Sequence, residues 1–190
     1  MVENVKALIV YGTRYGASAG TAEEIASVLR GEGFDVKVVN AKEEKIKDLN
    51  PYELIVVGSG LQIGKWTSEA EDFLKRFQND FANKKLALFA STMKTVSERQ
   101  GKTQDVEVTR KFALTDKVTK YSLQPISLGF FGGVIDYNKM NFLFRKTLGS
   151  IRQQLEKDGF KETSPGVYDL RDMEEIRSWA KDLAQKASQT

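Results

Sequence analysis

Short apolar, β-branched runs alternate along the chain with segments in which apolar residues recur every three or four positions. The apolar runs predict strands over Val5–Tyr11, Asp35–Asn40, Leu54–Val57, Leu86–Ala90 and part of Ser122–Gly133. The longer spacing predicts helices over about Thr21–Glu32, Ser68–Phe81, Asp105–Asp116, Lys139–Lys157 and Asp172–Ala187. Strands and helices that alternate in this way form a parallel sheet covered on both faces. We therefore expect a single α/β domain over residues 1–190.

Two details of this pattern concern local structure. Thr21, followed three positions later by Glu24, has the spacing of a capping box and predicts the start of the first helix. The polar segment Ser91–Gln104 shows no periodicity, and we interpret it as a long loop after the fourth strand. In parallel sheets ligands bind beyond the carboxyl ends of the strands, so the loops after strands one, three and four are the candidate binding segments.

The loop after the first strand is rich in glycine, alanine and hydroxyl residues and leads into a helix. Such a loop lets backbone amides approach an anion, and the helix dipole adds partial positive charge, so it favours a phosphate site. The alternative is a glycine-rich turn that only caps the helix. Neither a dinucleotide fingerprint nor a P-loop is present. The candidate phosphate-site residues are Thr13, Arg14, Tyr15, Gly16, Ala17, Ser18, Gly20 and Thr21.

The other two loops could hold a flat ring. In the segment Gly58–Trp66, backbone amides could face the polar edges of a ring while Ile63 or Trp66 covers one of its faces. The alternative is that Trp66 simply packs at the start of a helix. Hydroxyls of the segment Ser91–Gln104 could meet a third edge of the ligand, although a solvated surface loop is also consistent with the pattern.

The composition limits the reactions that the side chains of this protein could catalyse. Apolar residues make up 41% and charged residues 29% of the 190 residues, and the net charge of +3 is spread along the chain, which does not favour nucleic-acid binding. The chain has no Cys and no His, which excludes disulfides, thiolate nucleophiles, imidazole bases and Cys- or His-ligated metal sites. Redox chemistry would therefore come from an organic cofactor. We assign no catalytic residue and no metal ligand.

These three loops resemble those of the flavodoxin superfamily, and in particular the menaquinone-dependent protoporphyrinogen oxidase group. The segment Tyr11–Gly16 with Thr21–Ala26 resembles the family's phosphate loop and following helix, and Gly58–Trp66 resembles its loop beside the flavin. Segments Arg110–Phe112 and Gly132–Tyr137 are also similar to segments of the oxidase group. The resemblance implies a flavodoxin-like three-layer sandwich with strand order 2-1-3-4-5.

The same resemblance implies noncovalent FMN, with its phosphate at the first loop and its isoalloxazine ring at the other two. The ring-binding residues would be Ser59, Gly60, Leu61, Gln62, Ile63, Gly64, Lys65, Trp66, Ser91, Thr92, Met93, Lys94 and Thr95. It further implies an oxidoreductase, either protoporphyrinogen oxidase-like or quinone-reducing, whose partner is a redox protein or a quinone. Flavodoxin carriers are strongly acidic, whereas this chain carries +3. A small electron carrier and a flavin-binding scaffold with a regulatory partner remain as alternatives.

The sequence also bears on location. Nothing at the N-terminus resembles a signal peptide and no apolar stretch approaches the length of a membrane span, so we expect a cytoplasmic protein. In the expected helix over Lys139–Lys157, an apolar stripe runs from Met140 to Leu155 and Phe142 lies on the opposite side. Phe142 beside basic residues could contact a membrane surface, a quinone or a partner, or it could be an ordinary exposed or loop aromatic.

Overall fold

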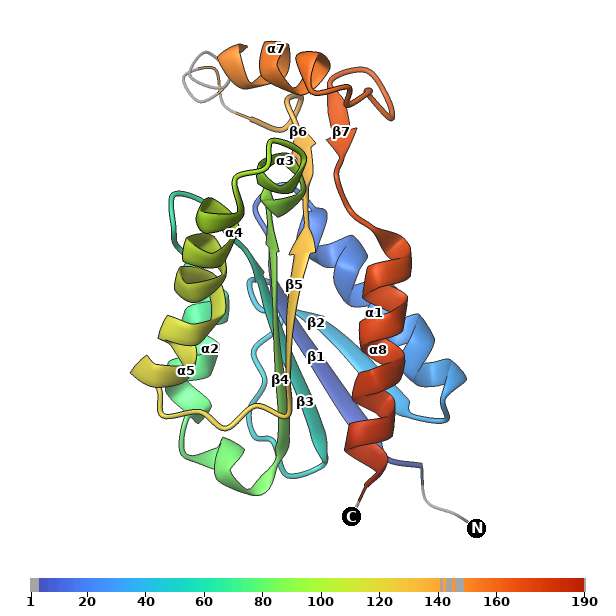
Figure 1. Ribbon diagram of the computed structural model, residues 1–190. Helices are drawn as coiled ribbons and strands as arrows, with labels where there is room; N and C mark the ends of the chain where they lie inside the picture. The colour runs from blue at the N-terminus through green and yellow to red at the C-terminus, as the bar shows by residue number, and fades with distance from the viewer. Residues whose placement is uncertain (1–3, 141, 143–144, 146–148, 190) are drawn as a thin grey trace.

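A five-stranded parallel sheet forms the centre of the computed structural model, which describes residues 4–140, 142, 145 and 149–189 (Figure 1). The strands are β1 (Lys6–Gly12), β2 (Asp35–Asn40), β3 (Leu54–Gly60), β4 (Lys85–Thr92) and β5 (Ser127–Gly132). Their order is β2-β1-β3-β4-β5, and every neighbouring pair is parallel. The flavodoxin-like fold and the strand order expected from the sequence are confirmed.

Helices cover both faces of the sheet, which explains why its inner strands are apolar throughout. Helices α1 (Ala17–Gly31) and α8 (Met173–Ser188) lie on one face, and α2 (Ser68–Phe77), α4 (Thr103–Arg110) and α5 (Asp116–Lys120) lie on the other (Figure 1). Shorter turns are α3 (Lys94–Arg99), the 3₁₀ helix η1 (Asp80–Asn83) and the π-helix η2 (Lys111–Thr115). Each face has its own apolar cluster, centred on Ile9 and Ile25 on the first and on Leu8 and Leu74 on the second.

A further unit lies beyond the carboxyl ends of the sheet. It contains β6 (Val134–Asp136) and β7 (Val167–Asp169), which pair antiparallel, and α7 (Gly149–Lys157). We call residues 133–170 the insert. Figure 1 shows it above the sheet, on the side where the loops after β1, β3 and β4 end. Its own apolar cluster includes Ile135, Tyr137, Leu155 and Tyr168. The insert thus covers the region in which the candidate binding loops meet.

The first helix begins earlier than the sequence pattern predicts. Gly16, at φ 96°, precedes the first helical residue, Ala17, and no side chain caps the helix. Thr21 lies inside the helix and its Oγ1 donates to the Ala17 carbonyl at 3.2 Å, so the predicted capping box is wrong. Alanine has the highest helix propensity, and glycine readily adopts the left-handed conformation that precedes this helix.

Other element boundaries also differ. The helix predicted to reach Phe81 ends at Phe77 and is followed by η1, while the predicted loop Ser91–Gln104 contains the end of β4, all of α3 and the start of α4. The predicted helix Asp105–Asp116 spans α4, η2 and the start of α5.

The start of the helix predicted at Lys139 is wrong, because Tyr137–Met140 form turns after β6. Asp136 Oδ1 accepts from the Asn138 backbone N–H at 3.0 Å and stabilises this turn. Most of the segment between Met140 and α7, including Phe144 and Leu148, lies outside the described residues. Among the helices that are described, none is both long enough and apolar enough to cross a membrane.

Candidate functional site

The three candidate loops meet at a cavity of about 270 Å³ between the carboxyl end of the sheet and the insert. Ligand pockets generally range from about 300 Å³ upwards, so the cavity lies just below the lower end of the range for small-molecule sites. The three loops contribute Thr13, Arg14, Tyr15, Ala17, Ser18, Gly60, Leu61, Gln62, Ile63, Ser91, Thr92 and Met93. Sequence segments up to about 80 positions apart are therefore brought together at one place, as expected for loops at the same end of parallel strands.

The N-terminus of α1 forms one end of the cavity. Gly16 donates its backbone N–H to Thr13 Oγ1 at 2.8 Å, which fixes the turn before the helix. The backbone N–H groups of Ala17, Ser18 and Ala19 have no acceptor among the described residues, and the first turn contains no acidic side chain. Ser18 is 0% exposed, and its hydroxyl has no hydrogen-bond partner in the part of the chain that the structure describes. Unpaired donors at a helix N-terminus suit an anion.

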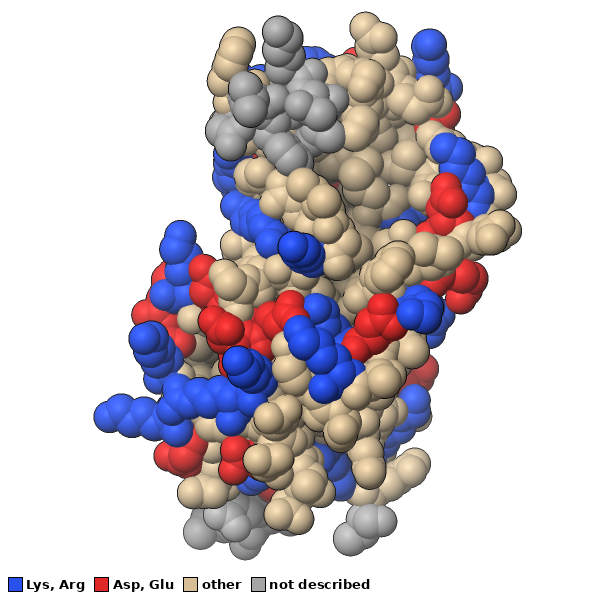
Figure 2. Space-filling model, turned by 90° about the vertical axis from the view of Figure 1, so that its left-hand side faces the viewer, with Lys and Arg blue, Asp and Glu red and all other residues tan. Residues whose placement is uncertain are grey.

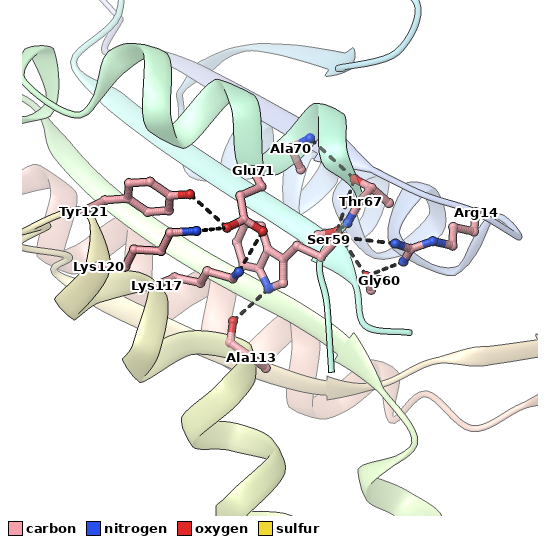
Figure 3. Close-up of polar contacts among 11 residues, drawn as sticks. Arg14, Ser59, Gly60, Thr67, Ala70, Glu71, Ala113, Lys117, Lys120 and Tyr121 are labelled. Atoms are coloured by element: carbon pink, nitrogen blue, oxygen red, sulfur yellow. Dashed lines mark hydrogen bonds and ion pairs between the residues drawn. The ribbon is translucent and has the colours of Figure 1, made fainter. Parts of the chain in front are cut away.

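Arg14 joins the first two loops. Its guanidinium donates to the carbonyl of Gly60 at 3.3 Å and to the carbonyl of Trp66 at 3.0 Å (Figure 3). No carboxylate among the described residues forms an ion pair with it. Its charge is therefore not cancelled by an acidic side chain, and it adds positive potential to the cavity wall.

The second loop is a tight reverse turn. Gln62 and Lys65 exchange two backbone hydrogen bonds of 3.0 Å, and the two residues between them, Ile63 and Gly64, have φ values of 51° and 69°. A positive φ is strained for a β-branched residue, at a cost of about 1–3 kcal/mol. The Ile63 side chain is also 83% exposed at the cavity rim. A strained, exposed apolar residue beside a cavity is typical of a ligand or partner contact.

The third loop contributes a second buried hydroxyl without a partner. Ser91 Oγ lies in the cavity wall and makes no hydrogen bond within the described part of the chain. The neighbouring Thr92 hydroxyl donates to the Phe131 carbonyl at 3.2 Å, so it is already used. Two of the residues that line this largely apolar cavity, Ser18 and Ser91, thus carry buried hydroxyls that have no partner among the described residues. Buried polar groups of this kind require a partner, which a bound ligand with polar edges would provide.

Not every residue predicted from the sequence lines the cavity. Trp66 is 2% exposed in the apolar core, and its Nε1 donates to the Ala113 carbonyl at 2.7 Å, which agrees with the alternative that Trp66 packs at the start of a helix. Ser59 Oγ accepts from the Thr67 backbone N–H at 2.9 Å and helps to fix the start of α2. The predicted residues outside the cavity lining are Gly16, Gly20, Thr21, Ser59, Gly64, Lys65, Trp66, Lys94 and Thr95.

Two of these residues have other structural partners. Lys94 Nζ forms ion pairs with Glu175 at 2.5 Å and Glu98 at 3.5 Å, and Lys94 is not a residue of the cavity lining. Thr95 Oγ1 donates to the carbonyl of Leu170 at 2.8 Å. The α3 turn, which the sequence pattern does not predict, thus joins Lys94 to α8 and Thr95 to the end of the insert.

One wall of the cavity was not predicted. The insert contributes an apolar surface that comes from β6, from the turn after it, from α7 and from the end of β7. These residues are Gly133, Val134, Ile135, Met140, Ile151 and Leu170. The apolar pair Val134-Ile135 is the one sequence feature that could have indicated this wall. Its partner strand β7 lies about 30 residues further along the chain, and no local pattern reveals that pairing.

An ion pair lies near the start of α1. Arg171 donates to both carboxylate oxygens of Asp169, at 2.9 and 2.5 Å. Burial alone would raise the pKa of the Asp169 carboxyl, but the hydrogen bonds and charge of Arg171 outweigh it and lower that pKa. A Cβ atom at Gly20 would lie 2.3 Å from Arg171 Nη1, so glycine leaves the space that Arg171 fills beside α1.

Comparison with known proteins agrees with this geometry. The flavodoxin domain matches residues 8–163, which is most of the chain. The chain belongs to the flavodoxin family. Membership supports a flavin-binding protein with a redox function, and the flavodoxin fold explains why the loops after β1, β3 and β4 converge on one cavity.

Individual relatives are distant. The protoporphyrinogen IX dehydrogenase [quinone] of Escherichia coli strain K12 is 22% identical over 182 residues, with 95% of each chain covered. A flavodoxin from the domain Archaea superposes with a TM-score of 0.58 at 17% identity, covering 97% of this chain and 100% of that one. A short-chain flavodoxin associated with a bacterial microcompartment has the same TM-score at 15% identity, covering 97% and 99%.

Proposed function

We propose that this protein binds FMN in the cavity beneath the insert and works as an FMN-dependent oxidoreductase. The observation that carries the proposal is the combination of an unpaired helix N-terminus with two orphaned buried hydroxyls in one apolar cavity. A phosphate monoester fits the helix N-terminus with the Ser18 hydroxyl, and a flat ring with polar edges fits the Ser91 hydroxyl. Family membership favours a flavin over other ligands of this shape.

Different residues would bind the phosphate and the ring of FMN. The backbone N–H groups at the start of α1 and the Ser18 hydroxyl would hold the phosphate, and Arg14 would add positive charge while it keeps two loops together. The loops around Gly60–Ile63 and Ser91–Met93 would surround the ring. Bound FMN supplies the electron-transfer chemistry, and the chain supplies binding, orientation and the surrounding charge.

The apolar insert wall supports an enzyme. Met140, Ile151 and Leu170 give the cavity a second apolar side, which would exclude water and present an apolar surface to a small organic substrate or a quinone. The similarity to the Escherichia coli dehydrogenase, whose name includes a quinone, points to the same class of reaction. We therefore propose transfer of reducing equivalents from an organic substrate, protoporphyrinogen-like or otherwise, to a quinone.

The second candidate function is a small electron carrier. Ile63 and Met93 are exposed at the cavity rim and form apolar contacts that a protein partner could cover. A carrier would exchange electrons with a reductase and turn over no small molecule. The enzyme would oxidise protoporphyrinogen IX, or a reduced nicotinamide, with a quinone as acceptor, and a panel of these substrates on FMN-loaded protein separates the two functions.

A peripheral contact near Phe142 is also part of the proposal. The Phe142 side chain is 78% exposed, and Met140, two residues earlier, lines the cavity. An exposed aromatic residue of the insert could rest on a lipid surface while a lipid-soluble quinone enters. The bulk of the molecule would remain outside the membrane.

Titration with FMN, monitored by quenching of flavin fluorescence, tests the binding proposal directly. We expect one FMN per chain, and no binding would overturn the proposal. Ser18→Ala removes an unpaired buried hydroxyl, so the apo protein should lose no stability while its Kd for FMN rises about tenfold. Thr21→Val is the matched control, because the Thr21 hydroxyl is already bonded within α1 and the FMN affinity should not change.

A further inference from the structure

A lysine of the insert lies over the start of α1. Lys139 is in the turn that follows β6, and its Nζ is 3.5 Å from the carbonyl oxygen of Tyr15. A Cβ atom built on Gly16, the residue that precedes α1, would lie 3.4 Å from the same Nζ. A residue more than 120 positions along the chain therefore places a positive charge at the N-terminus of the first helix.

The end of α1 that Lys139 approaches has the donors of an anion site. The backbone N–H groups of Ala17, Ser18 and Ala19 have no acceptor among residues 4–140, 142, 145 and 149–189. Ser18, a residue of the cavity lining at this helix end, is fully buried, and its hydroxyl also has no partner within the described part of the chain. The helix has 15 residues, so its dipole is well developed at this end.

Arg171, Arg14 and Lys139 are cationic residues near the start of α1, and they differ in how far acidic side chains already neutralise them. Arg171 is held by Asp169 through two short contacts. Arg14 donates only to carbonyl groups of the second loop. Lys139 lies 3.4 Å from Asp136, longer than a strong charge-assisted hydrogen bond, and its side chain is 60% exposed. Lys139 can therefore turn to an anion at little cost.

We propose that Lys139 completes the phosphate site, so that the insert itself selects phosphorylated flavins over unphosphorylated ones. The proposal rests on FMN binding in the cavity and assigns this selectivity to a residue outside the loops of the sheet. Lys139 Nζ donates to the phosphate monoester, together with the α1 amides and the Ser18 hydroxyl. The contribution of Lys139 to flavin affinity is specific to the phosphate, because riboflavin has the same ring as FMN and lacks the phosphate group.

The interaction also couples two parts of the molecule. The turn that carries Lys139 continues into Met140, which lines the opposite wall of the cavity. A phosphate bound by Lys139 would therefore link the turn after β6 to the start of α1. Flavins without a phosphate occupy the ring site with no such restraint on the insert.

Kd values for FMN and for riboflavin, measured on purified apo protein by flavin fluorescence quenching, test the proposal. Lys139→Met removes the charge and keeps a long apolar stem, whereas Lys139→Arg keeps the charge. Lys161→Met is the matched control, since Lys161 is an exposed lysine of the same insert and has no ion pair among the described residues. Each protein is titrated at about 0.05 and about 0.5 M salt, because screening separates charge effects from packing effects.

In Lys139→Met we expect the Kd for FMN to rise about tenfold at low salt, equivalent to ~1.4 kcal/mol, with the Kd for riboflavin unchanged. The difference from wild type should shrink at high salt, and Lys139→Arg and Lys161→Met should keep the wild-type preference for FMN. An unchanged preference in Lys139→Met, or an equal loss in Lys161→Met, overturns the assignment while FMN binding stands. Wild-type protein that binds neither flavin overturns the proposed function and this inference together.

Discussion

Glu71 ties the α2 side of the sheet to α5, and replacing it with glutamine is a quantitative test of the fold. Its carboxylate accepts from Lys117 Nζ at 2.8 Å, Lys120 Nζ at 2.7 Å and the Tyr121 hydroxyl at 2.8 Å (Figure 3). Elsewhere on this face, basic and acidic side chains are mixed (Figure 2). Lys117 is largely buried, so Glu71→Gln leaves a buried ammonium group without a carboxylate.

The pKa of Glu71 sets the size of the effect. Burial would raise this pKa, but hydrogen bonds from Lys117, Lys120 and Tyr121 outweigh burial and lower it from 4.5 to about 2. One pKa unit corresponds to about 1.4 kcal/mol, so the upper bound is ~3 kcal/mol. Lys120 is well exposed and solvent weakens its share, which leaves an expected loss of ~2 kcal/mol at pH 7.

The effect has a definite pH dependence. Because the folded-state pKa is below the ordinary value, the stabilisation is complete above about pH 5 and is lost as the pH falls towards 2. Urea unfolding of wild type and Glu71→Gln, followed by far-UV circular dichroism, should show the full difference at pH 7 and less than half of it at pH 3. Asp72→Asn, which changes the next, exposed residue of α2, is the control and should cost little at either pH. A difference that stays constant between pH 7 and pH 3 would refute the reasoning.

Three further outcomes are expected. Trp66→Phe should cost ~1–2 kcal/mol, because the buried Ala113 carbonyl loses its donor, and should leave the Kd for FMN unchanged; a large loss of FMN affinity would instead place Trp66 against the ring. Phe142→Asp should weaken association with anionic liposomes at least about tenfold in co-sedimentation, since burying a Phe side chain is worth about 1.5–3 kcal/mol. If liposome association and quinone reduction are both unchanged, the peripheral contact is eliminated. Gly132→Ala should destabilise the protein by more than ~2 kcal/mol in calorimetry, because its Cβ would lie 2.0 Å from the Leu170 carbonyl oxygen, whereas Gly31→Ala meets no atom within 4 Å and should cost nothing.

The sheet could be predicted from the sequence because its information is local. Strands such as β1 and β3 are buried on both faces, and an apolar β-branched run is the direct consequence of that burial. The start of α1 could not be predicted in the same way. The stretch Ala17–Gly20 has a loop-like composition, and only the left-handed Gly16 before it establishes that a helix begins there.

The site was predictable to the extent that the fold dictates it. Loops at the carboxyl ends of adjacent parallel strands must converge, so the meeting of Ser18, Gly60 and Ser91 follows from strand order alone. The position of Trp66 depends on an acceptor 47 residues away in η2, and no local spacing reveals that contact. The insert wall depends on β6 and β7, which are three residues each and pair across about 30 residues, too short for periodicity to show.

The part of the molecule that was hardest to predict bears most directly on the choice between enzyme and carrier. A carrier needs only an exposed edge of its cofactor, and the loops of the sheet alone could provide it. The insert adds an apolar wall to the cavity through Met140 and Leu170, and Lys139 places a charge over the start of α1. An apolar wall beside a bound flavin would limit its contact with water and offer a surface to a small apolar reactant, neither of which helps electron exchange between two protein surfaces. The insert therefore favours an enzyme with its own small-molecule substrate.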